Sequence, residues 1–154
     1  MLSALLLKND YNLVIAGLAA DKNYEELIRK TAQQLGVANR VKILGAITDS
    51  EKYWLLKNCA AFCFPSLAEG FGLPVIEAMQ FGTPVILSTA TSLPEIGGPH
   101  ALYLRDFSPE SISQTSADFL NTTITPEMKA RIIDWSMQFR WDIAAKKYWE
   151  LYRY

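Results

Sequence analysis

The chain has 154 residues, which suits one domain of ordinary size. With 50% hydrophobic and 20% charged residues, the composition predicts a compact core and excludes a disordered chain. The 15 Lys and Arg residues nearly balance the 16 Asp and Glu residues, and a formal charge of −1 argues against a nucleic-acid partner.

The first half of the chain alternates between apolar runs, which predict strands, and segments with helical spacing. In chain order we expect a strand (11–17), a helix (23–36), a strand (40–47), a helix (49–59) and a strand (60–66). Asn23 is the predicted N-cap of the first helix and Gly36 its predicted end. Asp49 is the predicted cap of the second helix.

The second half continues the alternation and then becomes helical. In chain order we expect a short helix (74–82), a strand (83–89), a turn with a short helix (92–98), a strand (100–105) and three helices (108–121, 125–139 and 140–154). Pro74 suits the first position of its helix and Gly82 its end.

Strands that alternate with helices at this spacing predict βαβ units. The strand runs are almost entirely apolar, as expected for strands covered on both faces. We therefore predict an α/β fold over residues 1–154, a doubly wound parallel sheet with Rossmann-like topology. Ligands of such sheets bind beyond the carboxyl ends of the strands, which selects three loops: 16–23, 45–50 and 65–73.

Cysteine and histidine offer little chemistry here. Cys59 and Cys63 are separated by three residues, which is not the redox spacing, and they are interpreted as small buried residues. The single histidine, His100, has no second histidine or acidic partner at a recognisable spacing, so a zinc site is not expected.

The loop 65–73 runs into the sequence EGFGLPVIE, in which Gly70 and Gly72 bracket Phe71. Glycines allow a sharp turn and close approach of a ligand to the backbone. If the helix begins at Pro74, the N–H groups of Gly72, Leu73 and Val75 point outward and form an anion site suited to phosphate. The third glycine of the dinucleotide fingerprint is missing, and so is the Gly-Lys-Ser/Thr of a P-loop.

Two glutamates, Glu69 and Glu77, flank this turn. Adjacent carboxylates can form an acid/base pair, although nothing in the spacing requires these two to be adjacent. Ionised carboxylates also accept hydrogen bonds from vicinal hydroxyls, as in ribose recognition. Alternatively, Glu77 stabilises the start of the helix and Glu69 is solvated.

The segment FPSLAEGFGLPVIEAMQFGTPVILS resembles the signature of the retaining glycosyltransferases of family four, which have the GT-B fold. That family carries Glu-x7-Glu with Pro-Ser before it, Gly-Phe-Gly within it and Ala-x-x-x-Gly-x-Pro-Val after it. The likeness covers about residues 5–115, because LVIAG, VKILGAITDSE and SLPEIGG follow in the expected order. The resemblance implies transfer of a sugar from a nucleotide-diphosphate donor to an acceptor, with retained anomeric configuration, in polysaccharide or glycolipid synthesis.

The resemblance also implies roles for individual residues. Glu69 would contact hydroxyls of the donor sugar, as the candidate catalytic residue, and Glu77 would hold the ribose hydroxyls. The backbone of the turn would offer N–H groups to the sugar and the distal phosphate, from Gly70, Phe71, Gly72 and Leu73. Three further residues would line the nucleotide end: Gly17, Gly45 and Ile47. No metal or other cofactor is implied, because the helix start and basic side chains would take the diphosphate charge.

Whole enzymes of that family have two Rossmann-like domains, and this chain corresponds to the second. The resemblance therefore implies that the N-terminal acceptor domain is absent from residues 1–154 and is a required partner. We expect the chain alone to bind nucleotide weakly without transferring sugar. Lys8 is not assigned to the diphosphate.

We expect a cytoplasmic location, or peripheral attachment to the inner face of the membrane in the full-length enzyme. The alternatives are a GT-B-like sugar-nucleotide epimerase, disfavoured by the Glu-x7-Glu block, and a non-catalytic nucleotide-binding or regulatory module.

The closing helix, 140–154, carries an aromatic stripe at helical spacing, composed of Trp141, Ala145, Tyr148 and Tyr152. Two alternatives stay open for this stripe. It packs on its own domain, or it is exposed and favours a homodimer.

Overall fold

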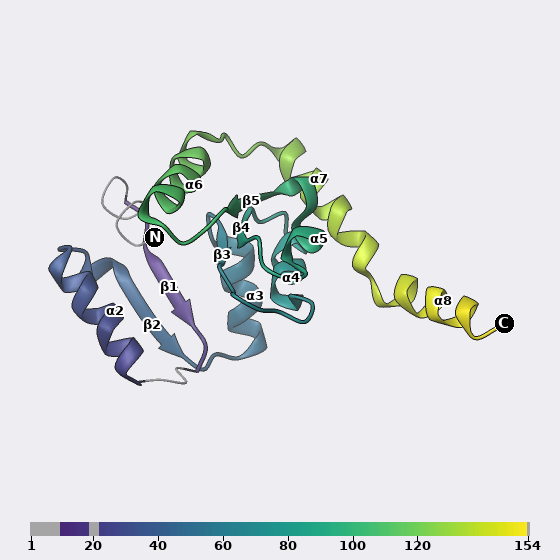
Figure 1. The fold of residues 1–154 in the computed structure, drawn as a ribbon, viewed down its shortest axis with the longest axis horizontal. Helices are drawn as coiled ribbons and strands as arrows, with labels where there is room; N and C mark the ends of the chain where they lie inside the picture. The colour runs from purple at the N-terminus through teal and green to yellow at the C-terminus, as the bar shows by residue number, and fades with distance from the viewer. Residues whose placement is uncertain (1–9, 19–21, 154) are drawn as a thin grey trace. The chain divides into compact units, whose positions relative to one another are not determined.

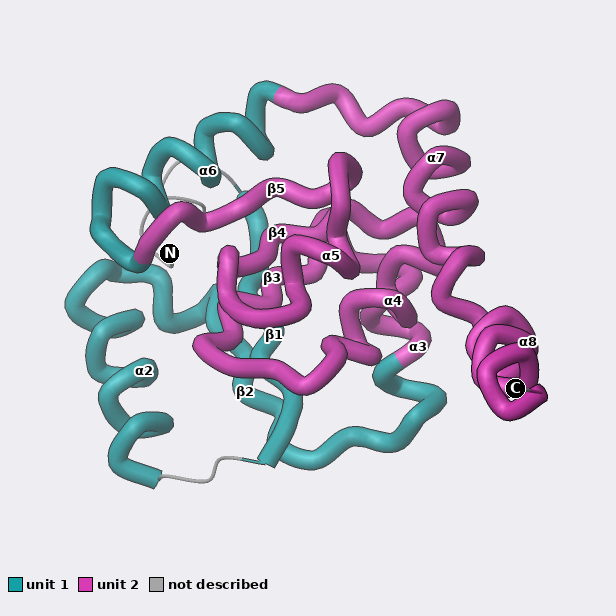
Figure 2. The backbone as a smooth tube through the Cα atoms, turned by 45° about the vertical axis from the view of Figure 1, so that its right-hand side comes forward, with its two compact units in different colours: residues 1–52, 107–121 teal, residues 53–106, 122–154 magenta. Residues whose placement is uncertain are grey.

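The structure is a computed structural model that describes residues 10–18 and 22–153. The chain divides into two compact units, which Figure 2 shows in different colours. Unit 1 comprises residues 1–52 and 107–121, and unit 2 comprises residues 53–106 and 122–154. Lys8 and the central part of the loop 16–23 lie outside the described residues.

Unit 1 is built on two parallel strands with helices beside them (Figure 1). Its elements are β1 (Leu13–Ala16), α2 (Lys22–Gln34), the 3₁₀ turn η1 (Ala38–Arg40), β2 (Val41–Gly45), the start of α3 (Asp49–Asn58) and α6 (Pro109–Asn121). Leu13 pairs with Val41, and both pack against buried Ala32 of α2 and Val37. The helix α2 therefore covers one face of this strand pair.

Burial alternates along β1 and β2, which corrects the expectation that every strand is covered on both faces. Leu13 and Ile15 are half-buried, whereas Val14 and Leu44 between the inward-facing positions are exposed. Successive side chains of a strand point to opposite faces, so the pattern shows one covered and one open face.

Two of the predicted helix caps are wrong, because both residues lie inside their helices. The helix α2 already includes Lys22, so Asn23 lies inside it and is not its N-cap. At α3 the cap is Thr48: its hydroxyl accepts from the N–H of Glu51 (3.3 Å), and the Glu51 carboxylate accepts from the Thr48 N–H (2.8 Å). This reciprocal pair is a capping box, which places Asp49 in the first turn. The predicted end of α2 at Gly36 is confirmed, since the Val37 N–H bonds the Ala32 carbonyl (2.9 Å).

Unit 2 is built on three parallel strands in the order β3–β4–β5. Its elements are the remainder of α3, β3 (Phe62–Phe64), α4 (Leu73–Gln80), β4 (Val85–Ser88), α5 (Leu93–Gly97), η2 (Gly98–His100), β5 (Ala101–Leu104), α7 (Pro126–Ser136), η3 (Met137–Phe139) and α8 (Trp141–Leu151). The central strand β4 is buried along its whole length, as predicted for a strand covered on both faces.

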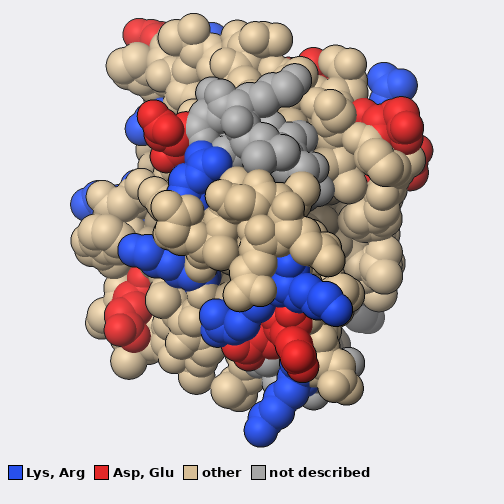
Figure 3. Space-filling model, turned by 90° about the vertical axis from the view of Figure 1, so that its left-hand side faces the viewer, with Lys and Arg blue, Asp and Glu red and all other residues tan. Residues whose placement is uncertain are grey.

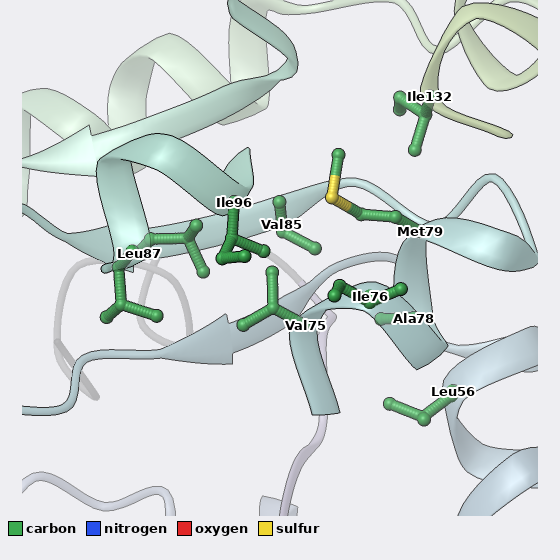
Figure 4. Close-up of a cluster of buried hydrophobic side chains, with 10 residues drawn as sticks. Leu56, Val75, Ile76, Ala78, Met79, Val85, Leu87, Ile96 and Ile132 are labelled. Atoms are coloured by element: carbon green, nitrogen blue, oxygen red, sulfur yellow. The ribbon is translucent and has the colours of Figure 1, made fainter. Parts of the chain in front are cut away.

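The core of unit 2 joins four of its helices to β4 (Figure 4). Leu56 of α3, Val75 and Met79 of α4, Leu87 of β4 and Ile132 of α7 are all buried in it. The predicted inward positions of α4 are confirmed, because Val75, Ala78 and Met79 are fully buried. This packing fixes the orientation of α4, the helix that carries Glu77.

The indole of Trp135 links α7 to the end of α5 and the turn that follows it. Its Nε1–H donates to the carbonyl of buried Ile96 (2.8 Å). A Cβ built on Gly98 would lie 2.2 Å from the Trp135 ring, so the ring and the backbone are in close contact. Tyr103 of β5 donates its hydroxyl to the Gly98 carbonyl (2.8 Å), which joins the same turn to the sheet.

The closing helix α8 has no buried residue, and its aromatic side chains are exposed. Trp141 is 79%, Tyr148 63% and Tyr152 80% exposed. The alternative in which this stripe packs on its own domain is therefore wrong for the described chain, because these rings are mostly exposed. None of the described helices is both long and apolar enough to cross a membrane.

Candidate functional site

The strongest candidate site lies where the chain leaves β3 and enters α4. Parallel strands present their carboxyl ends at the same edge of a sheet, and ligands of open α/β sheets bind there. The structure places five of the predicted residues together on this single turn and helix start: Glu69, Gly70, Phe71, Gly72 and Leu73. The sequence prediction of a glycine-rich turn followed by a helix is confirmed.

The start of α4 depends on Gly72, which is its N-cap with φ 97° and ψ 41°. This left-handed conformation is unfavourable for residues with a Cβ. A Cβ at this position would also lie 3.1 Å from Leu93 Cδ2. The helix begins at Leu73, one residue earlier than predicted, so Pro74 is the second helical residue and not the first.

One of the three N–H groups predicted to point outward does not do so. The N–H of Val75 donates to the Gly72 carbonyl (2.9 Å) and is used inside the first turn. Among the described residues, no hydrogen bond is found for the N–H groups of Gly72 and Leu73. The anion-binding capacity of this helix start therefore rests on those two donors.

The two glutamates occupy different parts of this site. Glu69 lies in the loop and is half-buried, and its own N–H donates to the Thr91 hydroxyl (3.0 Å). Glu77 is half-buried in the second turn of α4, beyond the first turn where a carboxylate stabilises a helix start most. The alternative in which Glu77 mainly stabilises the helix start is thus weakened.

Phe71 forms an apolar edge of the loop. Its ring stands edge-on to that of Phe139, with 6.1 Å between the ring centroids and an interplanar angle of 77°. The ring remains 44% exposed, and Leu73 beside it is 48% exposed. An apolar surface therefore borders the two donors of the helix start.

The predicted nucleotide-end residues lie in unit 1, at the carboxyl ends of β1 and β2. The N–H of Gly17 donates to the Gly45 carbonyl (2.8 Å), so these two glycines are neighbours. Both have a positive φ, 132° and 70°. Half-buried Ile47 immediately precedes the Thr48 cap of α3. The structure thus brings Gly17 and Gly45 together and places Ile47 in the same loop as Gly45.

Sequence reasoning missed the hydroxyl side chains that hold the site in place. Ser88 is the last residue of β4, Thr91 and Ser92 follow it, and each of the three hydrogen-bonds to the loop after β3. The available signal was the hydroxyl-rich run STATS at residues 88–92, which begins at the end of the predicted strand 83–89. The Thr48 cap was similarly signalled by TDSE, the pattern of a capping box.

The remaining candidate groups do not form a centre. Cys59 and Cys63 are free and half-buried, and burial raises the pKa of the Cys63 thiol to about 11. Among residues 10–18 and 22–153, no group of three or more His, Cys, Asp or Glu side chains is arranged to hold a metal ion. On the face drawn in Figure 3, basic and acidic side chains are interspersed.

Comparison with protein families gives a match over most of the chain. The family model described as "Glycosyl transferases group 1" matches residues 2–135. The chain is 38% identical over 88 residues to the MMP alpha-(1->4)-mannosyltransferase of Mycolicibacterium hassiacum, covering 57% of this chain and 21% of that protein. It is 32% identical over 137 residues to the serotype-specific mannosyltransferase WbdA of Escherichia coli, covering 88% and 17%. The chain thus spans about a fifth of the length of these relatives.

Solved structures share the fold. A glycosyltransferase from Rickettsia africae superposes with a TM-score of 0.80 at 18% identity, covering 99% of this chain and 42% of that one. Anabaena Alr3699/HepE in complex with UDP and glucose superposes with a TM-score of 0.79 at 22% identity, covering 99% and 43%. The predicted Rossmann-like α/β fold of GT-B glycosyltransferases is therefore confirmed, and with its match over residues 2–135 the chain belongs to the group 1 glycosyl transferases.

Proposed function

We propose that the chain is the donor-binding domain of a glycosyltransferase that moves a sugar from a nucleotide-diphosphate sugar to an acceptor. The observation that carries this proposal is the block from Glu69 to Glu77, which lies within the family match and at the carboxyl end of a parallel strand. Ligands of such sheets bind at this edge.

The proposed roles follow the geometry of the loop. The N–H groups of Gly72 and Leu73 take the distal phosphate at the positive end of α4. Glu69 accepts hydrogen bonds from the donor sugar, and Gly70 and Phe71 present their backbone to it. Glu77, one turn further along α4, holds the ribose hydroxyls.

The nucleotide end of the donor is assigned to Gly17, Gly45 and Ile47. The neighbouring glycines leave the backbone open, since a Cβ at Gly17 or Gly45 would meet no atom within 4 Å. This assignment, like those above, is part of the proposal. We propose that the diphosphate is bound without a metal ion, because helix-terminal N–H groups and basic side chains can stabilise its charge.

We propose that the anomeric configuration is retained and that the transferred sugar is mannose. The second assignment is supported by the relatives described above, both of which are named mannosyltransferases. We further propose that the acceptor is bound by a separate N-terminal domain, that the product is a polysaccharide or glycolipid made at the cytoplasmic side of the membrane, and that the 154-residue chain alone does not transfer sugar.

The test is a titration of the chain with GDP-mannose, UDP-glucose and the free nucleotide diphosphates. Binding is detected by NMR, because weak binding is expected. Saturable binding supports the proposal, and Glu77→Gln should weaken it about tenfold, the effect of losing one charged hydrogen bond. Glu150→Gln on exposed α8 is the matched control and should bind like the wild type.

Three outcomes would contradict parts of the proposal. Failure of the intact full-length protein to bind any of these nucleotides would favour a non-catalytic module. Interconversion of free sugar nucleotides without an acceptor would favour an epimerase. Sugar transfer by the 154-residue chain alone would overturn the need for a second domain.

A further inference from the structure

The loop after β3 is hydrogen-bonded along its length to the last residue of β4 and to the segment that follows β4. Three hydroxyl groups of residues 88–92 bond to its main chain: Ser88 Oγ donates to the Ser66 carbonyl, Thr91 Oγ1 accepts from the Glu69 N–H (3.0 Å), and Ser92 Oγ donates to the Phe71 carbonyl (3.0 Å). Leu93 adds an apolar contact at Gly72. We call residues 88–93 the clamp segment.

These contacts follow the parallel pairing of the strands from which the two loops emerge, with a register that shifts by two residues (23 − 21) along the loop. In the strand pair, Phe62 lies opposite Val85, an offset of 23 residues (85 − 62). The offset is 22 at Glu69 and Thr91 (91 − 69) and 21 at the end of the loop (93 − 72). The clamp segment therefore continues the pairing of β3 and β4 past the strand ends, with side-chain hydroxyls in place of backbone pairs.

Thr91 is the least expected residue of the clamp segment. Its φ of 48° makes it the one non-glycine residue with a positive φ in the described part of the chain. A β-branched residue is a genuine outlier in this region, because its Cβ is crowded by the backbone. Such strain persists where the surrounding structure requires it and often marks a functional site. A glycine would adopt this φ without strain but would lack the hydroxyl that binds Glu69.

Ser92 is also diverted from its usual role. It occupies the N-cap position of α5, where a serine side chain commonly accepts from the helix backbone, yet it makes no capping bond. The hydroxyl donates instead to the Phe71 carbonyl. By contrast, Thr125 at the N-cap of α7 does accept from the Met128 N–H (3.3 Å). The Ser92 hydroxyl of the clamp segment thus binds the loop and does not cap α5.

The bonds set the direction of the peptide groups in the loop. Peptide bonds in the described chain are trans, so the C=O and N–H of one peptide point in opposite directions. Because the Phe71 carbonyl points to Ser92, the N–H of Gly72 points away from the clamp segment. Because the Glu69 N–H is bound by Thr91, it is not available to a ligand.

We propose that Thr91, together with Ser88 and Ser92, is a positioning residue that holds Glu69 and the Gly72 N–H in the arrangement that binds the donor. This inference rests on the proposed function. A hydrogen-bonded support of this kind preorganises a site, and displacement of a binding group by about 1 Å can reduce activity by about 100-fold.

The test compares three substitutions at Thr91 in the 154-residue chain. Thr91→Val keeps the shape of the side chain and removes the hydroxyl, whereas Thr91→Ser keeps the hydroxyl. Thr91→Gly removes the hydroxyl and also the strain, because glycine adopts a positive φ freely. Two quantities are measured by NMR: the hydrogen-exchange rate of the Glu69 amide, and the dissociation constant for GDP-mannose or UDP-glucose. Thr125→Val is the matched control, because it also removes one hydroxyl that accepts from a backbone N–H.

We expect Thr91→Val and Thr91→Gly to expose the Glu69 amide to faster exchange and to weaken donor binding about tenfold, the usual effect of one lost hydrogen bond to a binding loop. Thr91→Ser should keep the exchange rate and the dissociation constant within about threefold of the wild type, because this variant loses only a methyl group and keeps the hydroxyl. Thr125→Val should lower thermal stability and leave both quantities unchanged.

Wild-type exchange and affinity in Thr91→Gly, a variant that relieves strain and therefore should fold, would overturn the inference. So would failure of Thr91→Ser to restore them. If the wild type binds no nucleotide, the proposed function fails, and the exchange rate of the Glu69 amide still decides whether Thr91 holds the loop.

Discussion

At the residue scale, the site depends most on Gly72. The residue combines a positive φ with a close contact to Leu93, so both backbone conformation and space exclude a side chain. Gly70, two residues earlier, has neither constraint, because a Cβ there would meet no atom within 4 Å. The two glycines of the same turn are therefore used differently.

We expect Gly72→Ala to reduce the free energy of unfolding by about 1–3 kcal/mol, the usual cost of a non-glycine residue in a strained conformation. Gly70→Ala should leave stability nearly unchanged. Urea denaturation of the two variants and the wild type measures this difference. Equal stability of the two alanine variants would contradict the assigned strain at Gly72.

Individual site residues were predictable to different degrees. The sequence pattern located the turn and helix around Gly72 because glycine and proline signal local backbone conformation directly. It could not locate Thr91, because its bond to Glu69 joins residues 22 positions apart (91 − 69) and depends on the register of two strands. The Val75 N–H was predicted incorrectly, because a start of α4 one residue earlier than expected leaves that group inside the first turn.

At the scale of elements, α3 is held at its start by the Thr48 and Glu51 capping box. The backbone N–H and the hydroxyl of Thr48 both donate to the Glu51 carboxylate (2.8 and 2.7 Å), which lowers the pKa of Glu51. A carboxylate with a lower pKa in the folded state stabilises the fold above its unfolded pKa, near 4.3. This contribution is lost as the pH falls through the folded-state pKa.

We therefore expect Glu51→Gln to be less stable than the wild type at pH 7, with a difference that disappears in acid below the folded-state pKa of Glu51. Chemical denaturation at a series of pH values measures the effect. Glu26→Gln, at an exposed site on α2, controls for the loss of one negative charge. A Glu51→Gln difference that stays constant with pH would argue against the capping role of the carboxylate.

The contact between α7 and the turn after α5 gives a second prediction at this scale. Trp135→Phe removes the donor to the carbonyl of buried Ile96, and an unpaired buried carbonyl costs about 1–3 kcal/mol. Trp54→Phe, at a side chain that is 65% exposed, should cost much less. Thermal denaturation distinguishes the two, and equal shifts in melting temperature would contradict the structural role of Trp135.

The elements themselves were largely predictable, because five apolar runs and seven helical patterns correspond to β1 to β5 and α2 to α8. Their ends were less so. Asn23 and Asp49 are both residues that favour caps, yet each lies inside its helix. At α3 the cap is Thr48, which is fixed by its bonds with Glu51, and a list of preferences does not contain such bonds. The open face of β1 and β2 was not predicted, because apolar residues stand on both faces of this strand pair.

At the scale of the whole molecule, α8 is a helix without a buried residue. Its stripe of Trp141, Tyr148 and Tyr152 presents aromatic surface to solvent. The homodimer, one of the two alternatives that the sequence left open, remains a proposal, and exposed apolar patches favour such association.

We expect the wild-type chain to self-associate with rising concentration in sedimentation experiments. The triple variant Trp141→Ser, Tyr148→Ser and Tyr152→Ser should remain monomeric. Ile143→Ser on the same helix, off the stripe, is the control and should behave like the wild type. A wild-type chain that is monomeric at high concentration would contradict the proposed dimer.

The loop between β3 and α4 is the proposed binding site of the donor nucleotide. The most direct measurement is the change in backbone amide chemical shifts when a nucleotide diphosphate is added to the chain. We expect the largest changes at Gly70, Phe71, Gly72 and Leu73, with further changes at Gly17 and Gly45. Saturable shifts confined to other parts of the chain, or no shifts at all, would contradict it.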